Sequence, residues 1–428
     1  MIKSIFIKNF KAYEKETIKI SKDNLLIGDN DSGKSTVLEA LDIFFNKDKI
    51  EKELIRNPDV DVEIGVLVYD ELSNYNFIKK IYKGKTGKFD SVEGNQSSLN
   101  SMSYVFIQAN SIDVKKLIGD LAIAKVKQDI TSEMTNQLQT LYENSINNVL
   151  STIDGQLMIV GNGTTSFSQK TTLKLESAVK YDISSSGVPI EGRGSGYKKT
   201  VVYSLLTKSK YENVIIGIDE IENSLSIKNA VQLINIVENL FCQSIITTHS
   251  VHLMSCVNSN SVIPIMNNSD AETVADMLLG LGNVDNKIFV LVEGKTDMQW
   301  INKVLTLIGK QDEYIVIQCG GSGNIDPVKN ELIRKGFGCR VIKDGDTHCV
   351  ESLSKECIEL YITLEGLNSL FGLSETAVPT DKNTFFSLIK SNNPSLSEDG
   401  IKDLIAENIS SFLLEDNQLI IDVQQLLV

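Results

Sequence analysis

The sequence predicts an α/β protein, because short apolar runs typical of buried parallel strands alternate with segments whose apolar residues recur at helical spacing. Three observations support this prediction. The apolar run 24–27 ends at a glycine-rich loop, and an amphipathic helix pattern follows at 35–45. Two further apolar runs, 214–218 and 244–248, end in acidic or polar residues. A second alternation of strand and helix patterns begins at Lys287.

Length and composition indicate a globular protein of two or more domains. The chain has 428 residues, of which 42% are hydrophobic and 23% charged, which suffices for two cores. No apolar run reaches the ~18 residues of a membrane helix, and the N-terminus lacks the apolar stretch of a signal peptide. The six scattered cysteines show no CxxC spacing. We therefore expect a cytoplasmic protein with reduced thiols and no membrane partner.

The expected elements can be placed in order along the chain. In the first part, strands are predicted at 4–7, 17–20, 24–27, 60–66 and 77–82, an exposed loop at 84–103, a polar helical segment at 112–150, strand patterns at 156–186, and a linker at 265–286. In the second part, strands are predicted at 288–292, 314–317 and 339–343, helices at 296–309 and 325–335, and a helical tail at 395–428. We place the domain boundary after residue 284, with an inserted loop and helical lobe at 84–170.

A phosphate-binding motif lies between the strand at 24–27 and the following helix. Residues 28–35 read Gly-Asp-Asn-Asp-Ser-Gly-Lys-Ser and fit the pattern G-x-x-x-x-G-K-[ST]. Backbone N–H groups of such a loop and the N-terminus of the next helix cradle nucleotide phosphates. Lys34 can reach the β- and γ-phosphates, and Ser35 can bind Mg²⁺. The expected nucleotide-binding residues are Asn30, Ser32, Gly33, Lys34, Ser35 and Thr36.

Acidic residues follow the strand at 214–218 and suit a hydrolytic role. Asp219 can hold Mg²⁺ through water, and Glu220 can act as base on the attacking water. His249 ends the strand at 244–248 and can contact the γ-phosphate, since ligands bind at the carboxyl ends of parallel strands. The alternative interpretations are a solvated strand end for the acids and a structural role for the histidine.

These motifs resemble the ATPase head of the ABC-type group that includes the SMC, RecF and OLD families. The resemblance rests on Ile7-Lys8-Asn9-Phe10, on the phosphate-binding loop and on Leu41-Asp42-Ile43-Phe44-Phe45. It implies ATP held between two heads, and therefore a homodimer or a higher even oligomer. A signature loop at 193–199 would bring Ser195 and Gly196 to the ATP of the other subunit. The chain departs from the family at Ile221, where a proline is common, and at Ser226-Ile227, where His-Pro is common.

A second set of acids follows the strands of the C-terminal part. Glu293 ends the strand at 288–292, Asp297 lies one helical turn further on, and Asp344 and Asp346 follow the strand at 339–343. Carboxylates at adjacent strand ends form an oxygen-rich pocket that suits Mg²⁺ or Mn²⁺. Two such ions can activate water and stabilise the leaving oxygen in phosphodiester cleavage.

The order of Glu293-Gly-Lys-Thr-Asp297, a glycine-rich turn at 320–323 and Asp344-Gly-Asp346 resembles the Toprim domain. In OLD-family proteins this nuclease and topoisomerase module is fused to the ATPase head. The resemblance implies catalysis by Glu293, Asp344 and Asp346, with Asp297 as a further metal ligand. It also implies a further glutamate, matched loosely by Glu365, and a helper lysine, for which Lys295 and Lys343 are candidates by position.

Three functions remain open. The first is an ATP-controlled nuclease of anti-phage defence that cleaves DNA, with a protein or RNA partner in the same system. The second is a non-cleaving ATPase sensor or scaffold, whose degenerate Toprim domain holds an effector or nucleic acid. The third is a Toprim enzyme that acts on RNA. The intact set of carboxylates favours cleavage, whereas the net charge of −14 argues against a basic nucleic-acid-binding domain and favours the scaffold.

Overall fold

The computed structural model divides the chain into two compact units, residues 1–112 with 206–428 and residues 113–205. It describes residues 1–69, 75–99, 102–108, 113–129, 211–224, 227–254, 256–266, 271–281, 284, 286–345, 351–394, 396, 398–413 and 417–427, and isolated positions from 184 to 206. The described parts of the second unit are α2 (Val114–Asp129), β8 (Ser184–Ser185) and β9 (Val188–Pro189). None of the described helices combines the length and the apolar character that crossing a bilayer requires.

An antiparallel sheet opens the first unit. Its strand order is β2-β1-β4-β5-β6, with β1 at Ile2–Phe10, β2 at Tyr13–Lys19, β4 at Val62–Tyr69, β5 at Tyr75–Tyr82 and β6 at Phe89–Glu93. Strand β1, between β2 and β4, is buried along most of its length, and its Ile5 pairs with Ile18 on one side and Val66 on the other. Because β2 lies at the edge of the sheet, its outer side has no strand partner among the described residues of this sheet and is accessible to other parts of the chain.

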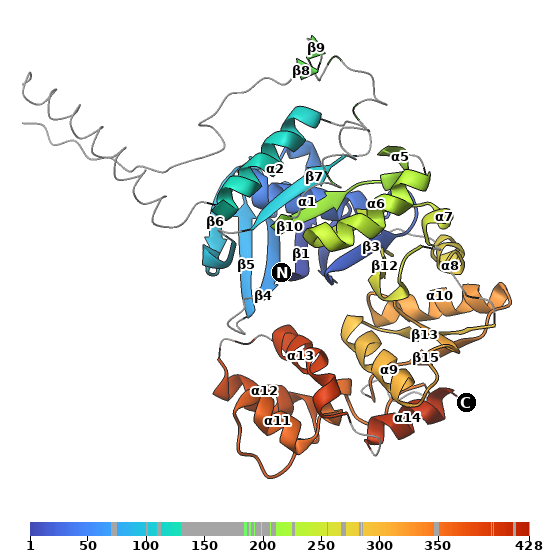
Figure 1. The fold of residues 1–428 in the computed structure, drawn as a ribbon. Coiled ribbons are helices and arrows are strands. Elements are labelled where there is room, and N and C mark those ends of the chain that lie inside the picture. Colours follow the sequence, from blue (N-terminus) through green and yellow to red (C-terminus); the bar gives the residue numbers. More distant parts are fainter. Residues whose placement is uncertain are drawn as a thin grey trace, which may run out of the picture. The chain divides into compact units, whose positions relative to one another are not determined.

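The second sheet is parallel and has the strand order β12-β3-β11-β10-β7. Its strands are β3 (Asp23–Ile27), β7 (Ser103–Ile107), β10 (Tyr211–Ile218), β11 (Phe241–Thr247) and β12 (Val262–Pro264). Helix α1 (Lys34–Asn46) shares one apolar core with both sheets, in which Val37 and Leu41 contribute beside Ile5 and Ile215 (Figure 1). The carboxyl ends of β3, β11 and β10 therefore meet at one edge.

Helices follow the parallel strands of this sheet. They are α5 (Ile221–Ser224), α6 (Ile227–Leu240), α7 (Val251–Met254) and α8 (Ala271–Leu279). Helix α8 falls within the segment that the sequence predicted as a linker, and its buried face consists of Val274, Ala275, Met277 and Leu278. That spacing is helical, so the linker prediction was wrong.

A third sheet, again parallel, forms the C-terminal part of the first unit. Its order is β14-β13-β15, with β13 at Ile288–Val292, β14 at Tyr314–Gln318 and β15 at Cys339–Ile342. Its helices are α9 (Lys295–Leu307), α10 (Ser322–Arg334), α11 (Leu364–Phe371), α12 (Lys382–Asn392), α13 (Glu398–Glu407) and α14 (Gln418–Leu427). The fully buried Trp300 of α9 packs against Phe412, so the predicted helical tail belongs to this core.

The structure also corrects the exposed loop predicted at 84–103, which contains β6 and a short 3₁₀ helix at Gln96–Leu99. Strand β6 reads Phe-Asp-Ser-Val-Glu and has no fully buried residue. It pairs only with β5 at the edge of the sheet, and an edge strand does not need the apolar alternation by which buried strands are found.

Candidate functional site

The phosphate-binding loop closes around the ammonium group of Lys34. This group donates hydrogen bonds to the carbonyl oxygens of Gly28, at 3.0 Å, and Asp29, at 2.7 Å. Burial lowers the pKa of Lys34, and the neighbouring acids, Glu220 first among them, act in the opposite direction. Lys34 is also the first residue of α1, where the helix dipole favours bound anions. The ammonium group and the helix N-terminus therefore face the same phosphate position.

Two other predicted contacts in the loop have distinctive surroundings. Gly33 has a φ of 108°, and a Cβ atom there would lie 2.9 Å from the hydroxyl of Tyr13. Ser32 is fully buried, and its hydroxyl has no hydrogen-bond partner in the described part of the chain. A buried polar group of this kind needs an explanation, and a ligand oxygen would supply the missing partner. Asn30 is exposed and Thr36 is buried.

Asp219 meets the phosphate-binding loop from the end of β10. One of its carboxylate oxygens, Oδ1, accepts hydrogen bonds of 2.7 Å from the hydroxyls of Ser35 and Thr247. Ser35 and Asp219 are 184 positions apart in the sequence, and the fold brings them together because β11 is the only strand between β3 and β10 in this sheet. A hydroxyl and a carboxylate are the oxygen ligands through which P-loop enzymes hold Mg²⁺, so these residues fit that ion.

Glu220 and His249 lie on neighbouring loops at the same edge. The backbone N–H of Glu220 donates to the Thr247 hydroxyl at 2.8 Å, and the φ of Glu220 is 43°, a left-handed value that costs energy for a non-glycine residue. Glu222 accepts a hydrogen bond from the backbone N–H of His249 at 2.9 Å, and its Oε1 lies 3.3 Å from the histidine Nδ1. Glu222 thus fixes the loop that presents His249, a contact that the sequence motifs did not indicate.

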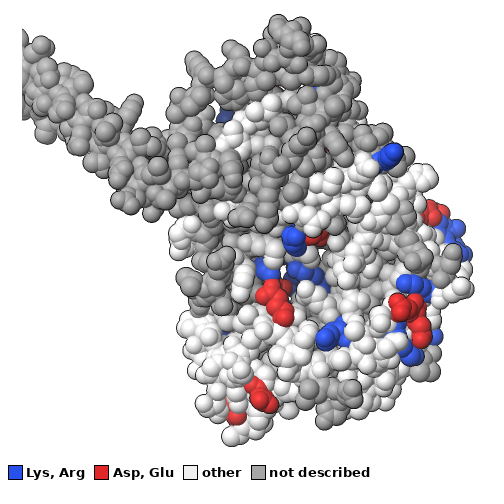
Figure 2. Space-filling model, in the orientation of Figure 1, with Lys and Arg blue, Asp and Glu red and all other residues white. Residues whose placement is uncertain are grey.

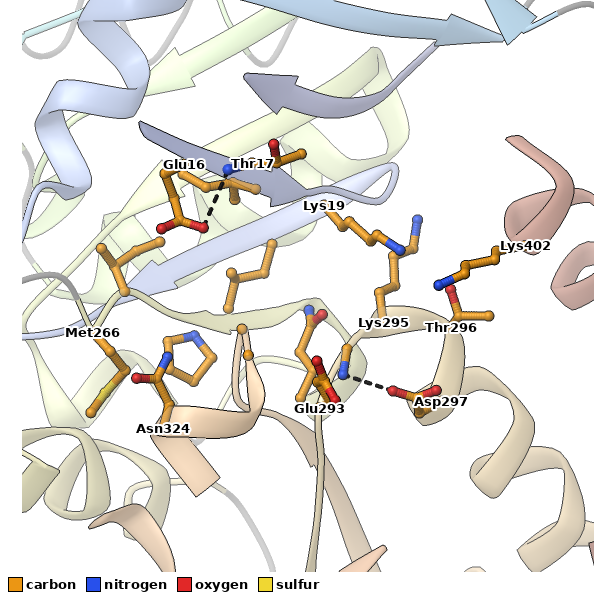
Figure 3. A pocket seen from close by; sticks show the side chains of 18 of the residues that line it. Glu16, Thr17, Lys19, Met266, Glu293, Lys295, Thr296, Asp297, Asn324 and Lys402 are labelled. Carbon is orange, nitrogen blue, oxygen red and sulfur yellow. Dashed lines mark hydrogen bonds between the residues drawn. The ribbon is translucent and has the colours of Figure 1, made fainter. Parts of the chain in front are cut away.

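A cavity of about 460 Å³ contains the second set of predicted acids. Glu293 follows β13, Asp297 lies in the first turn of α9, and Asp344 follows β15. All three line the cavity, together with Glu359, and Figure 3 shows Glu293 and Asp297 there. The backbone N–H of Gly294 donates to Asp297 at 2.9 Å, and that of Ile358 donates to Asp344 at 3.1 Å.

The carboxylates of this cavity are held where their charges are unfavourable. Burial raises the pKa of Asp344 to about 8, and the charges of Asp297 and Glu359 add to the shift. Burial also raises the pKa of Asp297 to about 6, with Glu359 next in effect. Glu359 is 2% exposed, and its Oε2 has no hydrogen-bond partner among the described residues. A cation would relieve both the repulsion and the missing contact.

The donor chemistry of the cavity therefore suits Mg²⁺ or Mn²⁺. Within the described ranges, however, no three or more His, Cys, Asp or Glu side chains are grouped closely enough to hold a metal ion. The predicted ligand Asp346 lies outside the described residues, as do Ser195 and Gly196 of the expected signature loop.

Sequence reasoning missed Glu359, which lies in the 3₁₀ helix Ile358–Tyr361. The loosely matched Glu365 is instead exposed on α11 and is not among the residues that line the cavity. The available signal was the position of an acid inside the run Cys-Ile-Glu-Leu-Tyr, because a charged residue rarely becomes fully buried without a partner or a function.

The two candidate helper lysines have other contacts. The ammonium group of Lys295 donates to the carbonyl of Ile20 at 2.7 Å, and burial lowers the pKa of Lys295 to about 8. Lys343 lies 3.5 Å from Asp326 and does not line the cavity. The lysines that line the cavity beside Lys295 are Lys19 of β2, Lys382 of α12 and Lys402 of α13.

The C-terminal helix stabilises the segment that carries Glu359. Asp422 of α14 is 6% exposed and accepts hydrogen bonds from the Ser354 backbone, from the hydroxyls of Ser354 and Tyr361, and from Gln418. Burial alone would raise the pKa of Asp422, but these hydrogen bonds lower it overall. Asp422 therefore connects Ser354 and Tyr361 to α14 through hydrogen bonds.

We expect Asp422→Asn to lower the free energy of unfolding by about 1–3 kcal/mol, because charge-assisted hydrogen bonds are lost. The pKa of Asp422 is lower in the folded protein than its ordinary value near 3.8. The ionised carboxylate therefore stabilises the fold fully above that ordinary value, and this stabilisation is lost as the pH falls through the lowered pKa. Urea unfolding of both proteins should therefore show a gap at pH 7 that narrows below about pH 4. The exposed Asp312→Asn serves as the control and should leave the midpoint unchanged.

Comparison with known proteins assigns the N-terminal part. The model of a family described as an AAA ATPase domain matches residues 1–185 and 120–254, which together span the first 254 of 428 residues. The chain belongs to this AAA ATPase domain family. The match confirms the ATPase domain and the ATP binding that the phosphate-binding loop predicted.

Individual relatives of this AAA ATPase domain protein are distant. Endonuclease GajA of Bacillus cereus (strain VD045) is 27% identical over 124 residues, which are 28% of this chain and 21% of that protein. The match thus spans about a fifth of the relative's length. A structure of the recombination mediator protein RecF with ATP has a TM-score of 0.37 and 16% identity, covering 58% of this chain and 93% of RecF. A second RecF structure has a TM-score of 0.25 and 15% identity over 80% of this chain.

Proposed function

We propose that this AAA ATPase domain protein is of the OLD type and that ATP controls its metal-dependent, Toprim-like nuclease, which cleaves nucleic acid in anti-phage defence. The observation that supports the nuclease most directly is that Glu293, Asp297 and Asp344, from two neighbouring strand ends, line one cavity. The name of the relative GajA, an endonuclease, supports the same class of reaction. DNA is the preferred substrate class over RNA.

In the ATPase reaction, each residue at the sheet edge has a separate role. Lys34 neutralises the β- and γ-phosphates, while Ser35 and Asp219 would hold Mg²⁺, which would offset the charge that develops on the phosphates. Glu220 takes the proton from the attacking water. His249, fixed through Glu222, contacts the γ-phosphate. ATP held between two heads makes the active species a homodimer or a higher even oligomer.

In the nuclease reaction, the carboxylates position the reacting groups. Glu293, Asp297, Asp344 and Asp346 would hold Mg²⁺ or Mn²⁺, which supplies an activated water and stabilises the leaving oxygen. Burial raises the pKa of Asp344 to about 8, so this side chain would give up a proton when a cation binds near pH 7. The reduced state expected for the cysteines is consistent with activity in the cytoplasm.

Control by ATP is supported by strand β2, which contacts both sites. At its first residue, the hydroxyl of Tyr13 donates to the carbonyl of Gly33 in the phosphate-binding loop at 3.3 Å. Just past its last residue, Ile20 accepts the hydrogen bond from Lys295, two positions after Glu293. We infer that a change in the phosphate-binding loop reaches the acidic cavity through β2.

The proposal predicts cleavage of plasmid or oligonucleotide by the purified chain when Mg²⁺ or Mn²⁺ is present, at a rate that ATP changes. Gel assays of single-stranded, double-stranded and RNA substrates, with and without EDTA, measure this directly. Because both reactions need a divalent cation, ATP hydrolysis is followed in the same samples. ATP hydrolysis without cleavage of any substrate would contradict the nuclease and leave the ATPase assignment intact.

That contrary outcome would favour a second candidate, an ATPase sensor or scaffold whose C-terminal domain holds an effector protein or nucleic acid without cutting. Two observations favour it. No three potential ligands are grouped around a metal position within the described ranges, and the net charge is −14. On the face of the described residues in Figure 2, acidic and basic side chains lie side by side in small groups, which suits a protein partner as well as a nucleic acid.

A further inference from the structure

Strand β2 belongs to the matched ATPase domain, yet it forms one wall of the acidic cavity. Glu16, Thr17, Ile18 and Lys19 line the cavity opposite the acidic strand ends of the third sheet. The hydrogen bond from Lys295 to the carbonyl of Ile20 fixes the end of β2 against the start of α9. In Figure 3, the side chain of Lys19 extends toward the side of the cavity where Lys402 and Asp297 lie.

We propose that Lys19 is a substrate-binding residue that contacts a phosphodiester group of nucleic acid in this cavity, so that the ATPase domain supplies part of the nuclease site. The inference rests on the proposed function and extends it by naming a residue that contacts the phosphodiester backbone of the substrate. The ligand chemistry is the phosphodiester group, which DNA and RNA share.

The charges of the cavity favour such a contact. Five acidic residues, Glu16, Glu293, Asp297, Asp344 and Glu359, line the cavity, and those that are ionised repel a polyanion unless cations offset their charge. Bound metal ions offset part of this charge, and lysine side chains can offset the rest while donating hydrogen bonds to phosphate oxygens.

The lining of the cavity identifies which lysines are close enough to contribute, namely Lys19, Lys382 and Lys402 beside Lys295. The charge of Lys19 lowers the pKa of Asp297, against the larger effect of burial. The charges of Lys382 and Lys402 lower the pKa of Asp344 in the same way. Three lysines from β2, α12 and α13 therefore surround the acids, and of these only Lys19 comes from the ATPase domain.

Lys19 can be removed without disturbing the core. Its neighbours Ile18 and Ile20 are buried and hold the strand in place, whereas Lys19 is half-buried at the rim. The same strand also provides a matched control. Lys15 carries the same charge four positions earlier on the same side of β2, is exposed and does not line the cavity.

The test is binding of fluorescein-labelled single-stranded DNA and RNA oligonucleotides, measured by fluorescence anisotropy with full-length protein and Mg²⁺. A Glu293→Gln background prevents cleavage during the measurement. We expect Lys19→Ala to weaken binding about tenfold. The slope of the logarithm of the association constant against the logarithm of the salt concentration should become smaller in magnitude by about 0.7, because one phosphate contact to a single strand is lost. Lys19→Arg should restore most of the affinity, and Lys15→Ala should bind like the parent protein. The two oligonucleotides distinguish DNA from RNA as the source of the phosphodiester group.

The inference is overturned if the parent protein binds neither oligonucleotide, if Lys19→Ala keeps the parental affinity and salt slope, or if Lys15→Ala loses as much affinity. Cleavage by the wild-type chain is scored separately. A wild-type chain that does not cleave contradicts the proposed nuclease, while the comparison of Lys19→Ala with Lys15→Ala still decides whether Lys19 binds the backbone. In a cleaving chain, Lys19→Ala should raise KM and leave kcat nearly unchanged.

Discussion

Replacement of Lys34 by alanine is expected to abolish ATP binding at micromolar nucleotide and to reduce hydrolysis at least about 100-fold, as loss of a preorganised charge at the phosphates does in other enzymes. Lys34 is 5% exposed and bonds to two carbonyls of the loop that must wrap the phosphates. The substitution thus removes both a positive charge and the group around which the loop is organised. Fluorescent ATP-analogue titration and phosphate release measure the two effects.

The control for Lys34→Ala is Lys11→Ala. This substitution breaks a half-exposed ion pair between Lys11 and Glu39, which lies on α1 with Lys34, and it should leave ATP binding unchanged. Circular dichroism establishes that both variants are folded. If folded Lys34→Ala protein binds ATP as the wild type does, the nucleotide lies elsewhere and the roles given to Ser35 and Asp219 are wrong as well.

The ATP site was predictable because its main residues form a local motif. Residues 28–35 contain the loop, the start of the helix and the lysine within eight positions, so phosphate binding can be predicted from the spacing of these residues alone. Asp219 and His249 were predictable for a different reason, since polar residues after apolar parallel strands reach one edge of a sheet. Glu222 was not predictable as the partner of His249, because their contact depends on how α5 meets the loop after β11.

The acidic cavity was only partly predictable. Glu293, Asp297 and Asp344 follow strand patterns, but Lys19 and the Ile20–Lys295 contact join segments 275 positions apart, which no local pattern reveals. Glu359 lies in an apolar run, and nothing in the sequence of α13 distinguishes Lys402 from the other charged residues of that helix. The helper lysines predicted from position, Lys295 and Lys343, have hydrogen-bond and ion-pair partners of their own.

The net charge of the chain has a different meaning once the positions of the charged residues are known. In sequence, −14 argues against nucleic acid as a whole-chain property. In the structure, five of the acids line one cavity together with four lysines. Under the proposed function, binding of nucleic acid depends on local pairing between these lysines and phosphates, and it should weaken steeply with salt.

Replacement of Glu293 by glutamine is expected to reduce metal-dependent cleavage at least about 1,000-fold and to leave ATP binding intact. The change keeps the shape of the side chain and removes one negative charge where β13 ends in the cavity. Carboxylates hold divalent metal ions mainly through that charge, whereas a neutral amide is a weaker ligand, and removal of a metal ligand removes both the activated water and the stabilised leaving oxygen. Quantified gel cleavage with Mg²⁺ and with Mn²⁺ measures the loss.

Glu313→Gln is the matched control, since it makes the same substitution at an exposed position just before β14 and should cleave normally. Partial rescue of Glu293→Gln by Mn²⁺ or by high Mg²⁺ would indicate that the defect is metal affinity and not folding. Full cleavage by Glu293→Gln would mean that the acids of this cavity are not the nuclease site. The burial and the charge repulsion that raise the pKa values of Asp297 and Asp344 would then have to serve the binding of a cation or partner without catalysis, which is what the scaffold function requires.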